Sequence, residues 1–93
     1  MASGQGFTEI DFSTGSNEAS IAVTGLSTIL STNSAEAFMM YEASSEHTAN
    51  DQAYAAALVG LTCGVPTDGV GFTIYARSTE KLNGKFLLRF VWA

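Results

Sequence analysis

The sequence predicts an all-β domain: a small antiparallel β-sandwich or jelly-roll-like domain of about six to eight short strands. Several short runs alternate between apolar and polar side chains, which is the period of a half-buried strand. Clusters of Gly, Ser, Asn and Asp separate these runs at intervals of about ten residues. The chain has 93 residues, which leaves room for one domain, so residues 1–93 are expected to form a single unit.

The last third of the chain has the clearest pattern. Residues 69–93 read as two alternating strands joined by a charged turn at residues 77–84, and we interpret them as a hairpin. A hairpin is only marginally stable by itself, so the rest of the chain or another subunit must cover it. The apolar positions that share a face within each strand are Phe72, Ile74 and Ala76, and then Phe86, Leu88, Phe90 and Trp92.

The same period of two predicts the earlier strands. Residues 7–12 follow a glycine-containing lead-in and form a first strand, suited to a sheet edge. Residues 19–24 form a second strand, and residues 26–30 a further short strand or a turn. Residues 35–42 contain Ala, Glu and Met, which favour helix, but a run of about eight residues between polar stretches is more typical of a strand.

The middle of the chain is expected to hold an exposed loop and a buried element. Residues 43–51 are rich in polar side chains and form the loop. Residues 52–63 are too apolar for a solvated element, and we interpret them as a strand buried on both sides, preceded by a helical turn around residues 51–56. Asn50 or Asp51 is expected to cap that turn.

Charge is scarce and gives no sign of nucleic-acid or membrane binding. Only 14% of the residues are charged, against about 25% in an average domain. The net charge is -5 and the four basic residues are scattered, so no basic stripe could neutralise phosphates or an anionic membrane. A small chain with few charges exposes a surface suited to burial against protein. We therefore expect a homo-oligomer, a dimer or a trimer.

Two further features bear on location and redox chemistry. The first residues lack the basic start and apolar core of a secretion signal, so we expect no signal-peptide export. The longest apolar run, residues 53–61, is much shorter than the about 20 residues that cross a bilayer. The single cysteine, Cys63, has apolar neighbours and is expected to be a small buried residue.

No reactive site stands out, and we expect a protein that is not an enzyme. The only cluster of ligand-type side chains lies in the polar loop and comprises Glu42, Glu46, His47 and Asp51. Its spacing matches no calcium loop, so a solvated acidic loop is the preferred interpretation. His47 with Ser44 and Ser45 contains triad-type residues, but closeness along a loop supplies neither orientation nor an oxyanion site. We assign no catalytic, metal-binding or cofactor-binding residues, and we expect no cofactor.

Candidate contact residues lie on the first strand and in the last third of the chain. We expect residues 1–12 to form an N-terminal arm that adds to a neighbour's sheet. Tyr75 and Trp92 are expected to point outward as aromatic anchors. Arg77 and Arg89 are expected to pair with Glu9, Glu80 or an acid of a neighbouring subunit. The full set of predicted interface residues is Phe7, Ile10, Phe12, Tyr75, Arg77, Arg89 and Trp92.

Four segments resemble short proteins encoded among the structural genes of tailed bacteriophages. They are GSNEASIAVTG (15–25), EHTAND (46–51), GFTIYA (71–76) and GKFLLRFVWA (84–93). The resemblance implies a virion structural protein assembled in the host cytoplasm. Within that group it implies a capsid decoration or cement protein, a small β-sandwich that joins neighbouring major capsid proteins. The expected partners are copies of itself and the major capsid protein or another virion protein.

A second and smaller resemblance is to the H-type lectin domain, a trimeric six-stranded sandwich. It rests on the GFT motif at residues 71–73 and the WA ending at residues 92–93, and no sugar-binding residues can be carried over. The alternative function that we keep open is a carbohydrate- or receptor-binding module of a phage tail or fibre.

Overall fold

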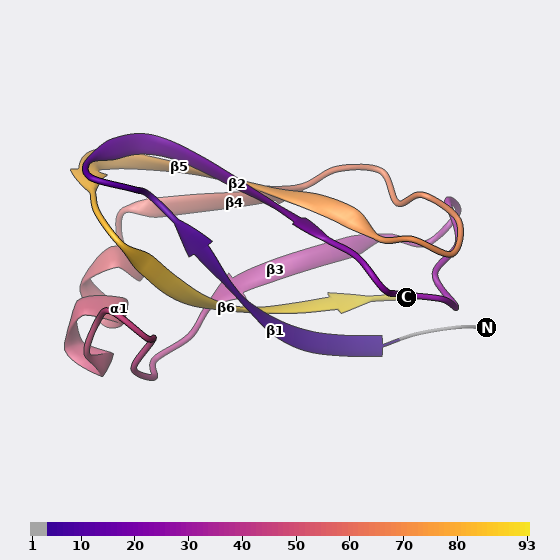
Figure 1. Cartoon of the computed structure of the whole chain (residues 1–93), viewed down its shortest axis with the longest axis horizontal. Helices are drawn as coiled ribbons and strands as arrows, with labels where there is room; N and C mark the ends of the chain where they lie inside the picture. Colours follow the sequence, from indigo (N-terminus) through magenta and orange to yellow (C-terminus); the bar gives the residue numbers. More distant parts are fainter. Residues whose placement is uncertain (1–3) are drawn as a thin grey trace.

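The computed structural model describes residues 4–93 and confirms the all-β prediction (Figure 1). Six strands form two three-stranded antiparallel sheets, which face each other as the layers of a sandwich, and a short helix lies at one end. The sheets have the strand orders β1-β6-β3 and β2-β5-β4. The elements are β1 (Gly4–Asp11), β2 (Ser16–Val23), β3 (Ala35–Met39), α1 (Ala49–Ala56), β4 (Val59–Cys63), β5 (Phe72–Leu82) and β6 (Lys85–Trp92).

β5 and β6 follow each other in sequence but lie in different sheets, so the predicted hairpin is wrong. β5 runs on to Leu82 through most of the predicted charged turn, and Ser78 continues its row of buried positions. The chain then crosses between the layers at Asn83 and Gly84, where Gly84 adopts φ +76°. Alternation identified both strands and their buried faces correctly. A period of two does not specify which strand pairs with which, and here the two apolar faces meet across the core.

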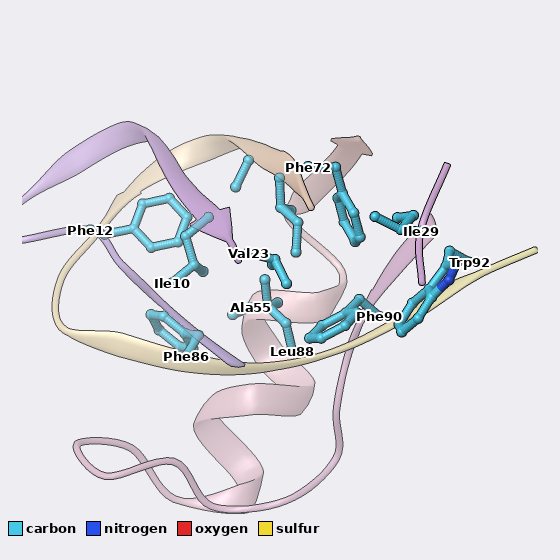
Figure 2. Close-up of a cluster of buried hydrophobic side chains, with 12 residues drawn as sticks. Ile10, Phe12, Val23, Ile29, Ala55, Phe72, Phe86, Leu88, Phe90 and Trp92 are labelled. Carbon is cyan, nitrogen blue, oxygen red and sulfur yellow. The ribbon is translucent and has the colours of Figure 1, made fainter. Parts of the chain in front are cut away.

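The core lies between the sheets and is rich in aromatic rings (Figure 2). Phe12 packs edge-on against Phe86 with ring centroids 5.8 Å apart, and Phe72 packs edge-on against Phe90 at 5.6 Å. Such pairs contribute about 0.5–1.5 kcal/mol beyond their buried area. The buried apolar residues are Ile10, Phe12, Val23, Ile29, Ala55, Phe72, Ile74, Ala76, Phe86, Leu88, Phe90 and Trp92.

β1 is an integral edge strand, which corrects the expectation of an N-terminal arm. It pairs with β6 along its whole length, from Gly4 opposite Trp92 to Asp11 opposite Lys85. Gly4 and Gly6 are part of this strand and not a flexible lead-in. A β-carbon at Gly4 would overlap the ring of Trp92, and one at Gly6 would lie 2.6 Å from Phe90 Cζ. Both glycines therefore leave space for core aromatics. Residues 1–3 of the predicted arm lie outside the described residues.

The middle of the chain differs from the predicted doubly buried strand. The helical turn predicted around residues 51–56 is confirmed and forms part of α1, but only Val59–Cys63 form a strand, whose residues are alternately half-buried and exposed. The N-cap of α1 is Thr48, which corrects the predicted cap at Asn50 or Asp51. Asp51 instead lies at the third helical position and completes a capping box with Thr48. The strand prediction for residues 35–42 is confirmed for Ala35–Met39, which form β3, whereas residues 40–42 lie outside it. Of the strand or turn predicted for residues 26–30, the structure has the turn, in which the Ile29 N–H donates to the Leu26 carbonyl at 3.2 Å and the Ile29 side chain is fully buried.

Gln52 attaches α1 to the edge of the first sheet. Its side chain is fully buried, and Nε2 donates to the carbonyl oxygens of Met40 at 2.8 Å and Leu87 at 3.0 Å. Its Oε1 accepts from the backbone N–H of Leu87 at 2.6 Å. β3 ends at Met39, so the Gln52 amide occupies the place of a strand residue beside β6. It satisfies backbone groups that would otherwise be buried without a partner.

Candidate functional site

The outer face of the β1-β6-β3 sheet carries large apolar side chains. We call it the phenylalanine face and define it by Phe7, Phe38, Leu87, Arg89 and Val91. The strand register places Phe7 opposite Arg89 and Arg89 opposite Phe38, so one row crosses all three strands. Phe7 is 59% exposed and Phe38 is 45% exposed. Directly opposed side chains have β-carbons about 5 Å apart, so the two rings flank the arginine on either side.

Arg89 is held in this row by its neighbour on β1. Its Nε donates to Oε1 of Gln5 at 3.1 Å, and its Nη2 donates to the same oxygen. In the next row, Gln5 and Glu36 lie on either side of Val91. The face thus combines an apolar centre with a polar border and one partly buried arginine, as protein–protein interfaces do.

The outer face of the β2-β5-β4 sheet is different, with small side chains around one aromatic ring. We call it the tyrosine groove and define it by Glu18, Ser20, Gly60, Thr62, Tyr75 and Arg77. These residues line a hollow of about 600 Å³. The register places Tyr75 between Thr62 and Ser20, and Arg77 between Gly60 and Glu18. Tyr75 is 53% exposed and stands above its small neighbours.

The predicted interface residues divide into two groups. Phe7, Tyr75 and Arg77 are exposed and Arg89 is half-buried on an outer face, so these four remain candidates for contact. Ile10, Phe12 and Trp92 are buried core residues, and their assignment to an interface is wrong. The outward orientation expected for Trp92 fails because its row continues that of Leu88 and Phe90, which faces the core. Its buried indole N–H has no hydrogen-bond partner within residues 4–93.

The predicted partners of the arginines also need correction. Arg77 pairs with Glu18 across the strands, not with Glu9 or Glu80, and both side chains are more than half exposed. Such a pair stabilises the fold by about 0–1 kcal/mol. Glu9 instead accepts two hydrogen bonds from Ser45, and Glu80 accepts one from Tyr54.

Burial raises the pKa of the half-buried Cys63 thiol, which keeps it in the neutral form.

The polar loop before α1 is fastened to the strands beneath it. The Ser44 hydroxyl donates to the Lys85 carbonyl at 2.5 Å, and Glu46 accepts from the Lys85 N–H at 2.9 Å. The His47 ring stacks on Phe86 with centroids 4.0 Å apart. Its Nε2 lies 2.6 Å from the Asn83 carbonyl and its Nδ1 lies 3.2 Å from Asp51. Within residues 4–93, no serine hydroxyl is hydrogen-bonded to Nε2, and the contacts of His47 hold the loop against the strands.

The same loop makes the stability of the fold depend on pH. Hydrogen bonds from the Ser45 backbone and side chain lower the pKa of Glu9 below its ordinary value of 4.5, and the nearby Lys85 adds to this. Hydrogen bonds from His47 and the Thr48 backbone lower the pKa of Asp51 below 3.8. A carboxyl with a lowered pKa stabilises the folded state when ionised. That stability is present above the unfolded-state pKa and is lost as pH falls through the folded-state pKa.

We therefore expect the thermal midpoint to fall on acidification from about pH 5 to pH 3. The double variant Glu9→Gln/Asp51→Asn should melt at a lower temperature than the parent at pH 7, and its midpoint should vary less over the acidic range. Circular dichroism melts at several pH values measure both effects. Glu42→Gln, an exposed acid with no hydrogen bond within residues 4–93, is the control. A double variant with the same acid-dependent slope as the parent would contradict this account.

The described residues form neither a metal-binding group nor a membrane-spanning helix. Within residues 4–93, no three His, Cys, Asp or Glu side chains come together as a metal-binding group. The helix in that part of the chain, α1, has eight residues and is too short to cross a membrane.

Sequence reasoning missed Phe38 as a surface residue, although a signal was present. Alternation in residues 35–42 puts Phe38 on the same side as Glu36 and Glu42, and a side with two carboxylates is the exposed one. Gln52 carried no comparable signal, because its role depends on where β3 ends.

No protein-family model, curated protein or solved structure matches this chain. Its function must therefore be inferred from the two outer faces of the sandwich.

Proposed function

We propose that this chain is a non-enzymatic structural protein of a phage particle. In this role it is a capsid decoration or cement protein that binds its own copies, as a dimer or trimer, and the major capsid protein. The observation that carries the proposal is the phenylalanine face, where two exposed aromatic rings flank Arg89 on a sheet surface. Aromatic residues and arginine are the residue types that dominate binding energy at protein interfaces.

The size and charge of the molecule support a docking role. Its extents are 36 × 21 × 19 Å, so one broad side is close to the about 800 Å² that each partner buries in a standard interface. Scarce charge lowers the desolvation cost of covering such a side. The resemblance to small phage virion proteins supplies the identity of the partner, the major capsid protein.

The contact is proposed to involve the sheet surface and not a detachable arm. Deleting residues 1–12 would remove β1 together with the core side chains of Ile10 and Phe12. Loss of binding after that deletion would report loss of the fold, so surface substitutions are the better test.

Phe7→Ser/Phe38→Ser should weaken self-association and capsid binding by at least roughly tenfold, because each truncated anchor at an interface centre typically costs more than about 1 kcal/mol. Light scattering after size-exclusion chromatography measures self-association. Co-sedimentation with shells of the phage that encodes the chain measures attachment. Leu30→Ser/Val65→Ser is the matched control, because it removes two exposed apolar side chains outside both sheets.

A parent protein that stays monomeric at high concentration and does not sediment with the shells would refute the proposal. Unchanged association of the phenylalanine double variant would show that another surface makes the contact. A far-ultraviolet spectrum equal to that of the parent establishes that the variant is folded.

A further inference from the structure

We propose that the tyrosine groove, on the sheet opposite the phenylalanine face, is a binding site for a neutral saccharide. Saccharide binding in the tyrosine groove does not depend on attachment to a capsid, because the groove and the phenylalanine face lie on different sheets and comprise different residues. The hollow of about 600 Å³ falls within the about 300–1,000 Å³ of small-molecule sites.

The aromatic platform comes from the pattern of small residues around Tyr75. Its neighbours across the strands are Thr62 and Ser20, and the adjacent glycines Gly60 and Gly64 have no side chains. A β-carbon at Gly64 would lie 3.5 Å from Tyr75 Cε2, so the ring extends over β4 toward this residue. An exposed aromatic ring above a floor of small residues presents an apolar surface on which the C–H groups of a sugar ring can pack.

The polar groups beside the ring include both hydrogen-bond donors and acceptors, as binding of sugar hydroxyls requires. The Arg77 guanidinium has five N–H donors, and its hydrogen bond to Glu18 uses one oxygen of that carboxylate. Within residues 4–93, no hydrogen bond involves the other Glu18 oxygen or the hydroxyls of Ser20 and Thr62. Adjacent donors and acceptors suit vicinal hydroxyl groups, each of which both donates and accepts.

The charge of the groove indicates a neutral ligand. Arg77 and Glu18 are its only charged lining residues, and they neutralise each other. A phosphate or carboxylate ligand would compete with Glu18 for the guanidinium and lie close to its negative charge, whereas a neutral sugar can bind alongside the intact pair. The groove therefore favours a neutral hexose or N-acetylhexosamine over an acidic sugar or a nucleic acid.

Amide chemical shifts during titration with methyl glycosides of glucose, galactose, mannose, rhamnose and N-acetylglucosamine test this proposal. At millimolar concentrations of at least one glycoside we expect shifts confined to Gly60, Thr62, Tyr75, Arg77 and their neighbours. Tyr75→Ala should weaken binding about tenfold because the stacking surface is lost. Gly60→Val should also weaken it, since a β-carbon there meets no heavy atom closer than 4.0 Å and extends into open space.

Tyr54→Ala is the matched control, because Tyr54 is 60% exposed on α1, away from the groove. It should leave the titration unchanged. The proposal is overturned if no glycoside shifts the groove amides, if Tyr75→Ala binds as the parent does, or if glucuronic acid binds more tightly than glucose. Each measurement uses free protein, so failure of capsid attachment would leave its outcome unaffected.

Discussion

Gly71→Ala should destabilise the fold by about 3 kcal/mol or more, which is a large share of the about 5–15 kcal/mol that stabilises a typical domain. A β-carbon at residue 71 would overlap the carbonyl oxygen of Val23 and lie 2.8 Å from its carbonyl carbon. Both atoms belong to the backbone at the end of β2, so no side-chain rotation relieves the overlap. Gly71 also has φ +155°, which residues with side chains rarely adopt.

Gly15→Ala separates the effect of the positive φ from the effect of the overlap with the Val23 backbone. Gly15 has a similar φ of +147°, but a β-carbon there meets no atom within 4 Å. Its loss of stability should be limited to backbone strain, on the order of 1 kcal/mol. Urea unfolding of both variants measures the difference. Equal losses at the two positions would mean that the close approach to Val23 contributes nothing.

Gln52→Leu should have the second largest effect, a loss of about 2–5 kcal/mol. Leucine has a similar volume and keeps the site filled, so the loss comes from backbone groups left without partners. The Leu87 N–H and the Met40 carbonyl, which bond Gln52 at a partly buried position, would both be left unsatisfied, at about 1–3 kcal/mol each. The Leu87 carbonyl would keep a second hydrogen bond, from the Met40 N–H at 3.2 Å.

Hydrogen exchange distinguishes this cause from a general loss of packing. The Leu87 amide should exchange faster in Gln52→Leu than the loss of global stability alone predicts. Gln5→Leu is the matched control, because Gln5 is exposed and bonds only the Arg89 side chain within residues 4–93. Its stability should change by less than about 0.5 kcal/mol. Similar losses for both glutamine variants would contradict the role assigned to Gln52.

The strands and the rows of residues that share one side of each strand could be predicted because alternation is a local property. The rows from Phe72 to Ala76 and from Phe86 to Trp92 are buried as the period of two requires. The same rule resolved residues 35–42 in favour of β3, against their helix propensity.

The errors concern properties that depend on distant parts of the chain. Alternation gave the correct row for Trp92 but not its direction, because the core side is known only once the opposite sheet is placed. The helical turn expected around residues 51–56 extends to the full helix α1, because Thr48 caps it and Gln52 fits beside β6, and this shortens the predicted buried strand to Val59–Cys63. The tyrosine groove was partly foreseen through Tyr75. Glu18 and Gly60 join it only through the pairing of β5 with both β2 and β4.

The central position of β5 and β6 in their sheets has a consequence for biosynthesis. Among residues 4–93 the four ladders are β1 with β6, β3 with β6, β2 with β5, and β4 with β5, so the first four strands of that range form no ladder among themselves. A nascent chain that has not yet reached Phe72 therefore lacks the strands with which these four pair. Sheet formation should wait until β5 and β6 have been made, and folding should be slow, since most contacts link residues far apart in sequence.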